Sequence, residues 1–202
     1  MTDHYYSKNP QSKKTPIELT CSLKGNEFKL LASGGVFSKS GIDFGTRTLI
    51  EAFNIPGTNG GILDLGCGYG PIGLALAKKH SDRLITMADV NERAVELAKE
   101  NASRNGVANV EIYESDGFKQ IPSGKYAAIL TNPPIRAGKK VIYQWFEESA
   151  SYLAETGELW IVVQKKQGAP SMKKFLSGIY QKVETVAHEK GYHIIRARHV
   201  ID

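Results

Sequence analysis

Apolar and polar residues alternate at the start of the chain. Four apolar side chains occupy the odd-numbered positions from Ile17 to Leu23, and the apolar segment 28–32 follows the turn sequence KGNE. A period of two is typical of a β-strand with one buried face. We therefore predict a small N-terminal β-hairpin that packs against the main sheet, preceded by a flexible tail at residues 1–16.

Beyond residue 46, segments with helical periodicity alternate with short apolar segments. The predicted helices cover residues 46–54, 71–80, 92–105, a segment that includes Val141 to Leu153, and 170–178. The predicted strands between them cover residues 60–66, 83–89, 109–115, 125–131 and 157–163. Strands that alternate with helices indicate a parallel sheet with helices on both faces.

The last two predicted strands, residues 182–188 and 193–200, depart from this alternation. Only a short connection around Gly191 separates them. A parallel connection needs a crossover of about a dozen residues or more, so these strands must form an antiparallel hairpin. The predicted fold class is α/β, with a Rossmann-like, doubly wound, mostly parallel sheet of seven strands that ends in this hairpin. We expect residues 17–202 to form one domain.

Composition narrows the class of protein without defining its chemistry. The 202 residues are 41% hydrophobic and 23% charged, which is ordinary for a globular protein. We find no secretory signal and no apolar run of membrane-spanning length, so we expect a cytoplasmic protein without a membrane partner. Two cysteines and five histidines show no metal-ligand spacing, and no metal is predicted. The formal net charge of +5 suits an anionic partner such as nucleic acid.

A glycine-rich loop follows the first strand of the alternating region. In LDLGCGYGPIG, Gly68, Gly70 and Gly73 have the G-x-G-x-x-G spacing that also serves nicotinamide and flavin cofactors. Asp64 lies on the strand, two positions before Gly66. A carboxylate there would repel a pyrophosphate, but it suits a ligand with an ammonium and a sulfonium group. S-adenosylmethionine is such a ligand, so Asp64, Gly66 and Gly68 are predicted to bind this cofactor.

Further carboxylates follow the next two predicted strands. Asp89 ends the second strand, where it can accept hydrogen bonds from both ribose hydroxyls. Asp116 and Gly117 follow the third strand, where the carboxylate can accept a hydrogen bond from the adenine amino group. The alternative roles are structural, with Asp89 beside a helix N-cap at Asn91 and Asp116 in an Asx turn. Because these strand ends share one edge, we expect one cofactor site there.

The fourth strand of the alternating region ends in TNPPI. Proline cannot donate a backbone hydrogen bond, so the strand must stop at Thr131 or Asn132 and continue as a stiff loop. An amino nitrogen on a purine ring is a poor nucleophile because its lone pair is delocalised. If the Asn132 side-chain oxygen and the Pro133 carbonyl each accept one N–H, that lone pair can point at a sulfonium methyl. The loop is a candidate catalytic site, and its alternative role is that of a strand terminator.

Three segments together resemble the class I S-adenosylmethionine-dependent methyltransferases: DLGCGYGPIG, NPPI and the upstream GVFSKSGIDFGTRTLIEAF. The similarity extends from about residue 17 to the C-terminus. More narrowly, the three segments resemble the methyltransferase small domain group, which includes the guanine-N2 methyltransferases of small-subunit ribosomal RNA. The resemblance implies methyl transfer to an exocyclic or amide nitrogen at the NPP sequence. It also implies that Pro134, Ile135 and Arg136 lie beside the substrate.

Ile135 departs from the pattern of related adenine-N6 and glutamine-N5 enzymes, which carry an aromatic residue after the prolines. A branched aliphatic side chain contacts a base only by apolar packing, so Ile135 argues against both activities. Arg136 is then a candidate to stack on the base through its guanidinium plane. In the upstream segment, Phe37, Asp43 and Thr46 are candidates to close over the cofactor.

Basic residues near the predicted site are candidates to hold RNA. Their side chains would contact phosphates and give an affinity that falls with salt, and the alternative for each is a solvated surface residue. These candidates are Arg136, Lys139, Lys140, Lys165, Lys166, Lys173, Lys174, Arg196 and Arg198.

The predicted function is methyl transfer from S-adenosylmethionine to guanine N2, in RNA of the small ribosomal subunit (16S), by a monomer or weak dimer. Within the same enzyme class, an adenine-N6 or a protein glutamine-N5 methyltransferase remains open. A non-catalytic RNA-binding module on the same fold is an alternative from another class. A nicotinamide oxidoreductase is disfavoured by Asp64.

Overall fold

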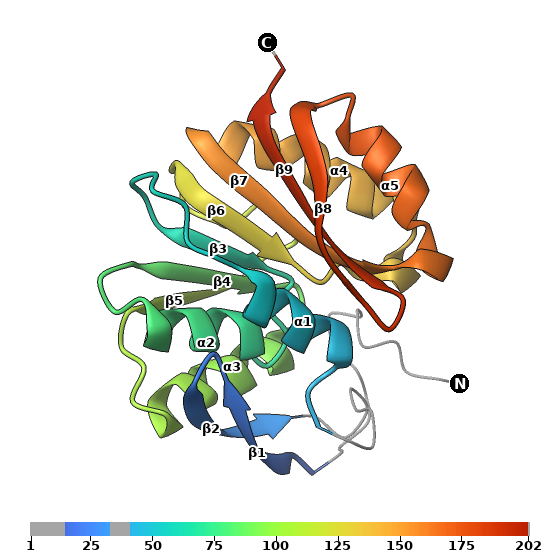
Figure 1. Cartoon of the computed structure of the whole chain (residues 1–202). Coiled ribbons are helices and arrows are strands. Elements are labelled where there is room, and N and C mark those ends of the chain that lie inside the picture. The colour runs from blue at the N-terminus through green and yellow to red at the C-terminus, as the bar shows by residue number, and fades with distance from the viewer. Residues whose placement is uncertain (1–14, 33–40, 202) are drawn as a thin grey trace.

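A seven-stranded sheet with helices on both faces forms the centre of the molecule (Figure 1). The computed structural model describes residues 15–32 and 41–201. The strands are β1 (Ile17–Leu23), β2 (Asn26–Ala32), β3 (Ile62–Leu65), β4 (Ile85–Asp89), β5 (Val110–Glu114), β6 (Tyr126–Thr131), β7 (Leu153–Gln164), β8 (Tyr180–Glu189) and β9 (Tyr192–Val200). The α-helices are α1 (Phe44–Ala52), α2 (Pro71–Lys79), α3 (Glu92–Arg104), α4 (Lys139–Tyr152) and α5 (Ala169–Leu176), and the 3₁₀ turns are η1 (Ile135–Ala137) and η2 (Lys165–Gln167).

The strand order confirms the predicted fold class. The order across the main sheet is β5-β4-β3-β6-β7-β9-β8. Strands β3 to β7 pair in parallel, whereas β9 pairs antiparallel with both β7 and β8. The chain runs outward from β3 to β5 and then returns to β6 on the other side of β3. The strand order therefore reverses between β3 and β6, where ligands bind in sheets of this kind.

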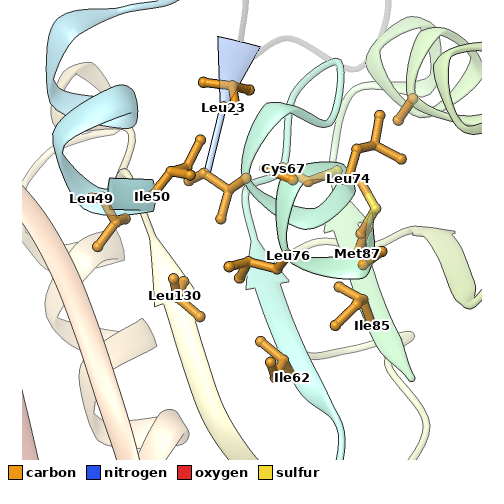
Figure 2. Packing of buried hydrophobic residues seen from close by; sticks show 14 of the residues in the cluster. Leu23, Leu49, Ile50, Ile62, Cys67, Leu74, Leu76, Ile85, Met87 and Leu130 are labelled. Carbon is orange, nitrogen blue, oxygen red and sulfur yellow. The ribbon is translucent and has the colours of Figure 1, made fainter. Parts of the chain in front are cut away.

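Successive residues of the buried strands face opposite helix layers. Ile62 belongs to the buried cluster under α1, α2 and α3, and Leu63 belongs to the cluster under α4 and α5. Figure 2 shows residues of the first cluster, in which Leu74 of α2 lies beside the sheet residue Met87. Each fully buried side chain of this size contributes about 1.5–3 kcal/mol. Continuous apolar runs such as AAIL in β6 are explained by burial on both faces.

The N-terminal hairpin packs on helices instead of on the main sheet, which corrects one expectation. β1 and β2 form a separate antiparallel sheet that lies against α2 and α3 (Figure 1). On α3, the Asn101 side chain accepts from Leu31 N at 2.7 Å and donates to Leu31 O at 2.8 Å. Asn105 bonds Lys29 in the same way. The two helices already cover that face of the main sheet, so the hairpin's apolar side covers them.

Strand β7 begins earlier than its pattern predicted. α4 ends at Tyr152, and Leu153 starts the strand instead of completing the helix. Leu153 has extended backbone dihedrals, pairs with Tyr126 and is buried. An apolar residue at helical spacing also fits a buried strand, so periodicity alone could not place this boundary.

Two predictions fall on parts of the chain outside this description. The tail predicted at residues 1–16 lies outside it up to residue 14, and Phe37 lies outside it as well. Among the residues that are described, no helix is long and apolar enough to cross a bilayer.

Candidate active site

A cavity of about 220 Å³ opens at the carboxyl edge of the sheet, where the strand order reverses. It is bordered by the ends of β3, β4, β5 and β6 and by α4. Six of the predicted site residues line it: Gly66, Asp89, Asp116, Gly117, Asn132 and Pro134. The structure thus brings together motifs that are separated by up to about seventy residues in the sequence.

The glycine loop is held against β4 by its own backbone. Gly66 N and Cys67 N both donate to Ala88 O, at 2.8 and 2.9 Å, and Gly68 N donates to the Asp89 carboxylate at 2.8 Å. Gly66 has φ +75°, and a Cβ there would lie 3.3 Å from the Trp145 ring. Glycine is favoured at this position because the positive φ strains any other residue and a Cβ would press on the Trp145 ring.

Asp64 is fully buried beneath the loop and does not line the cavity. Its Oδ2 accepts from Gly73 N at 2.8 Å, while Oδ1 has no hydrogen-bond partner among the described residues. Burial raises the pKa of Asp64 to about 7, with Asp89 adding to the rise and the Gly73 N–H opposing it. A buried carboxylate oxygen without a partner fits a site that receives a cationic ligand. The ammonium and sulfonium of S-adenosylmethionine match this requirement.

Asp89 lies beside the N-cap of α3, which is the structural role considered for it, and it also lines the cavity. Oδ2 accepts from Gly68 N, and Oδ1 accepts from Asn91 N at 2.9 Å. Asn91 caps α3 by accepting from Ala94 N. Burial raises the pKa of Asp89, and these backbone N–H groups oppose the rise. Each carboxylate oxygen has a second lone pair, so Asp89 can still accept from ribose hydroxyls.

Asp116 stands at the mouth of the cavity on a tight turn. Its side chain is 60% exposed, and Oδ2 lies 2.5 Å from Lys119 Nζ. Ser115 fixes the turn because its hydroxyl donates to Gly117 O at 2.7 Å and accepts from Gln120 N at 3.1 Å. Both the predicted adenine contact and the structural turn are compatible with this geometry.

Trp145 is a cavity residue that the sequence did not identify as one. Its indole lies against Gly66 and Gly117, and a Cβ on Gly117 would be 2.9 Å from Nε1. Val141, one turn earlier on α4, lines the same cavity. Residues at i and i+4 share one helix face. The i, i+4 spacing of Val141 and Trp145, shortly after NPPI, is the sequence feature that could have identified them as cavity residues. The sequence analysis placed both residues on a helix and assigned neither a role in the site.

Asn132 is fixed by two residues from the start of α1. Its Nδ2 donates to Asp43 Oδ2 at 3.2 Å and to Thr46 Oγ1 at 2.9 Å. A carboxylate can only accept, so the amide nitrogen must face Asp43 and the amide oxygen must face away. Asp43 also caps α1 by accepting from Thr46 N. Asp43 and Thr46 were predicted to close over the cofactor, whereas the structure places them against Asn132 and not among the cavity-lining residues.

The prolines end β6 and start a short turn, as the sequence predicted. β6 stops at Thr131, both prolines are buried, and Pro134 O accepts from Ala137 N at 2.8 Å. Ile135 is half-buried against the core cluster under α4, and Arg136 is exposed. Neither side chain lines the cavity, so their substrate contacts stay predictions.

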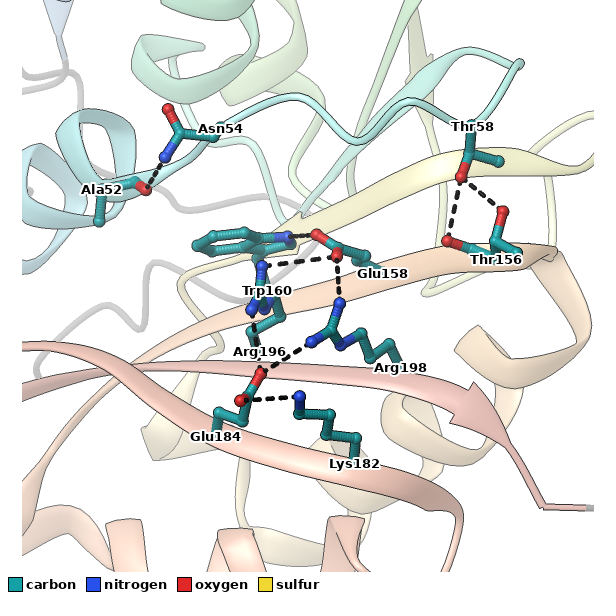
Figure 3. A network of polar contacts seen from close by, with 10 residues as sticks. All are labelled: Ala52, Asn54, Thr58, Thr156, Glu158, Trp160, Lys182, Glu184, Arg196 and Arg198. Carbon is teal, nitrogen blue, oxygen red and sulfur yellow. Dashed lines mark hydrogen bonds and ion pairs between the residues drawn. The ribbon is translucent and has the colours of Figure 1, made fainter.

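Arg196 and Arg198 form ion pairs inside the protein, and the phosphate contact predicted for them stays a prediction. Figure 3 shows both guanidinium groups between Glu158 and Glu184 on neighbouring strands. The Arg196 Nη2 to Glu184 Oε2 distance is 2.9 Å, and the Arg196 guanidinium lies 5.5 Å from the centre of the Trp160 ring. Their charge is therefore matched inside the protein.

The thiol of Cys67 lies in the glycine loop at this edge. Cys67 is buried, and burial raises the pKa of its thiol well above its usual value, so it stays protonated near neutral pH. Within residues 15–32 and 41–201, no three His, Cys, Asp or Glu side chains are grouped to hold a metal ion.

The fold and the cavity define a class I methyltransferase. The chain belongs to the methyltransferase small domain family, whose model matches residues 27–196. This membership confirms the family resemblance and S-adenosylmethionine as the predicted cofactor.

Individual relatives place the chain within this family. It is 53% identical over 201 residues to "Uncharacterized protein YbxB" of Bacillus subtilis, covering 99% of this chain and 100% of that one. It is 36% identical over 146 residues to ribosomal RNA small subunit methyltransferase C of Aeromonas hydrophila, covering 70% of this chain and 42% of that one. The T. thermophilus 16S rRNA N2 G1207 methyltransferase, solved in complex with AdoMet and guanosine, matches with a TM-score of 0.80 at 21% identity. That match covers 95% of this chain and 53% of the solved one. The chain spans about half the length of the curated rRNA methyltransferases that it matches.

Proposed function

We propose that the protein transfers a methyl group from S-adenosylmethionine to an exocyclic amino nitrogen of RNA, namely guanine N2 in small-subunit ribosomal RNA. The orientation of the Asn132 amide carries this proposal. Both N–H groups of the amide are occupied by Asp43 and Thr46, so the group that it offers to a substrate is the oxygen. An oxygen acceptor at the catalytic position selects a substrate nitrogen that carries hydrogen.

The chain's own residues supply positioning and hydrogen-bond acceptors. S-adenosylmethionine, when bound, supplies the electrophilic methyl group. Asn132 Oδ1 accepts one N–H of the target amine, and the Pro133 carbonyl, held by the stiff turn, accepts the other. Two fixed acceptors orient the nitrogen lone pair for an in-line displacement, which is an effect of pre-organisation. Asp89 and the glycine loop would hold the cofactor, and the buried carboxylate of Asp64 beneath the loop would add a negative potential that suits its cationic part.

Two observations support guanine as the base. The relatives with assigned names include small-subunit ribosomal RNA methyltransferase C, and the structural relative carries guanosine together with AdoMet. Ile135 stands where adenine-N6 and glutamine-N5 enzymes have an aromatic residue. A half-buried isoleucine provides apolar contact but no stacking surface of its own.

The test is transfer of labelled methyl to unmodified small-subunit RNA and to assembled small subunits, followed by digestion to nucleosides. We expect the label in N2-methylguanosine. Label in N6-methyladenosine would retain the amine chemistry and refute the guanine assignment. Label in protein glutamine would refute RNA as the substrate. Cofactor binding without transfer to any acceptor would favour the non-catalytic module.

A further inference from the structure

Three lysines surround a surface recess next to the active-site edge. The recess has a volume of about 590 Å³ and is lined by Gln164, Lys165, Lys166, Lys190 and Gly191. It lies where β7 ends and the β8–β9 turn begins, so it is separate from the cofactor cavity. All three lysines are exposed.

The backbone holds the lysines together. Lys165 N donates to Gly191 O at 2.8 Å, which ties the end of β7 to the β8–β9 turn. Lys190 and Gly191 both have positive φ, +48° and +80°, as the two central positions of a type I′ turn require. Asparagine and glycine are the favoured residues there, and a lysine in this conformation is unusual. Its ammonium lies 4.5 Å from the centre of the Phe44 ring, so the turn directs this charge toward α1.

The positive charge of the recess is not matched inside the described part of the protein. None of the three lysines forms an ion pair with a described residue, and no acidic side chain lines the recess. Arg196 and Arg198, on the same sheet, are each paired with two glutamates. Three unpaired ammonium groups around one hollow repel one another, and a polyanion relieves this repulsion.

The recess is connected to the catalytic residue through the start of α1. Phe44, which Lys190 covers, directly follows Asp43, and Asp43 accepts from Asn132. β7 is the neighbour of β6, and Ile161 pairs with Thr131. Gln164 is three residues further along β7, which places the recess about 10 Å beyond the level where β6 ends. A strand that delivers a base to Asn132 can therefore cross the recess.

We propose that this recess binds backbone phosphates of the RNA substrate, on the β7 side of the target base. The inference rests on the proposed function in taking RNA as the substrate. It selects Lys165 and Lys166 from the basic residues found in the sequence and adds Lys190, which the sequence did not single out. Because phosphates carry no base identity, the recess contributes affinity and register, while the base is read at Asn132.

The test compares two triple variants with the same change in charge. The first is Lys165→Gln with Lys166→Gln and Lys190→Gln. The control neutralises three exposed lysines on β2, α2 and α3, which belong to the β3–β5 half of the main sheet: Lys29→Gln, Lys79→Gln and Lys99→Gln. Binding of a fluorescein-labelled fragment of unmodified small-subunit RNA is measured by anisotropy between 0.05 and 0.3 M salt, roughly the range over which counterion release is resolved. Methyl transfer is measured in parallel.

For the recess variant we expect the slope of log K against log salt to fall by about 2, since each phosphate contact on a single strand contributes about 0.7. This corresponds to an affinity loss on the order of ten- to fiftyfold at 0.15 M salt. KM for RNA should rise while kcat at saturating RNA stays at the wild-type value. The control should bind like wild type. A third variant, with Lys→Arg at the same three recess positions, keeps the charge and should also bind like wild type.

Three results would overturn the inference, and they point to different faults. A recess variant that binds like wild type, while wild type methylates RNA, refutes the recess and leaves the proposed function intact. An equal loss in both triple variants indicates general charge attraction instead of a site. A wild-type protein that neither binds nor methylates RNA refutes the proposed substrate, and the recess inference falls with it.

Discussion

Removing the Asp43 carboxylate should slow methyl transfer without weakening cofactor binding. Asp43 Oδ2 lies 3.2 Å from Asn132 Nδ2 and is the charged one of the two acceptors that orient the amide. A hydrogen bond to a charged group contributes about 1.5–3 kcal/mol. If that energy is used to hold the amide oxygen toward the substrate, kcat in Asp43→Ala should fall about 10- to 100-fold.

The Asp43 variant also loses the N-cap of α1, so stability must be measured separately. Loss of the cap costs about 1 kcal/mol. Asp43→Ser is the matched variant, because serine can still cap the helix but brings no charge to Asn132. Thr46→Val removes the neutral acceptor at 2.9 Å and should lower kcat about 2- to 10-fold.

Single-turnover rates, the Kd for S-adenosylmethionine and urea unfolding together separate these effects. We expect Asp43→Ser to unfold like wild type and to transfer slowly. Wild-type rates in both Asp43 variants would refute the reasoning, since Asn132 would then be oriented without the carboxylate. A loss confined to cofactor affinity would instead return Asp43 to the cofactor-closing role first expected of it.

Three further predictions concern residues beneath and around the cavity. Asp64→Asn should weaken cofactor binding yet stabilise the free protein by about 1–3 kcal/mol above pH 7, as measured by urea unfolding at several pH values. The pKa of Asp64 in the folded protein is about 7, above its usual value of 3.8, so wild type loses stability as pH rises from 4 to 7. The extra stability of Asp64→Asn over wild type should therefore vanish below about pH 4. Cofactor binding should change the fluorescence of Trp145, and the signal should persist in Trp160→Phe and be absent in Trp145→Phe; the reverse pattern would place the cofactor elsewhere. Gly73→Ala should destabilise the protein by about 1–3 kcal/mol, because its Cβ would lie 2.6 Å from the Met87 side chain; if this clash is the cause, Gly73→Ala should cost less in a Met87→Ala background than in wild type.

The main sheet could be predicted from sequence because periodicity reports burial. Strands buried on both faces gave continuous apolar runs, and the short link at Gly191 allowed only an antiparallel hairpin. Burial patterns do not report which element covers a face. The N-terminal hairpin was therefore found but assigned to the wrong neighbour, and Leu153 was assigned to the helix that it follows.

The cofactor loop and the NPP turn were accessible because each is a local motif. Residues that act through distant partners were not. Asp43 and Asn132 are 89 positions apart, and no local spacing links them. Trp145 became a cavity residue only when α4 packed beside Gly66 and Gly117. Arg196 and Arg198 looked like free cations until β7 and β8 placed Glu158 and Glu184 beside them.

The most direct test of the central claim is the single-turnover rate of Asn132→Ala, with S-adenosylmethionine and RNA both saturating. The account predicts a loss of at least about 100-fold in transfer rate, because a fixed acceptor at the reacting nitrogen is removed, with the Kd for S-adenosylmethionine within about twofold of wild type. A variant that binds the cofactor normally and transfers at the wild-type rate would contradict the account. In that case the NPP turn would only end β6, and the amine would be activated elsewhere.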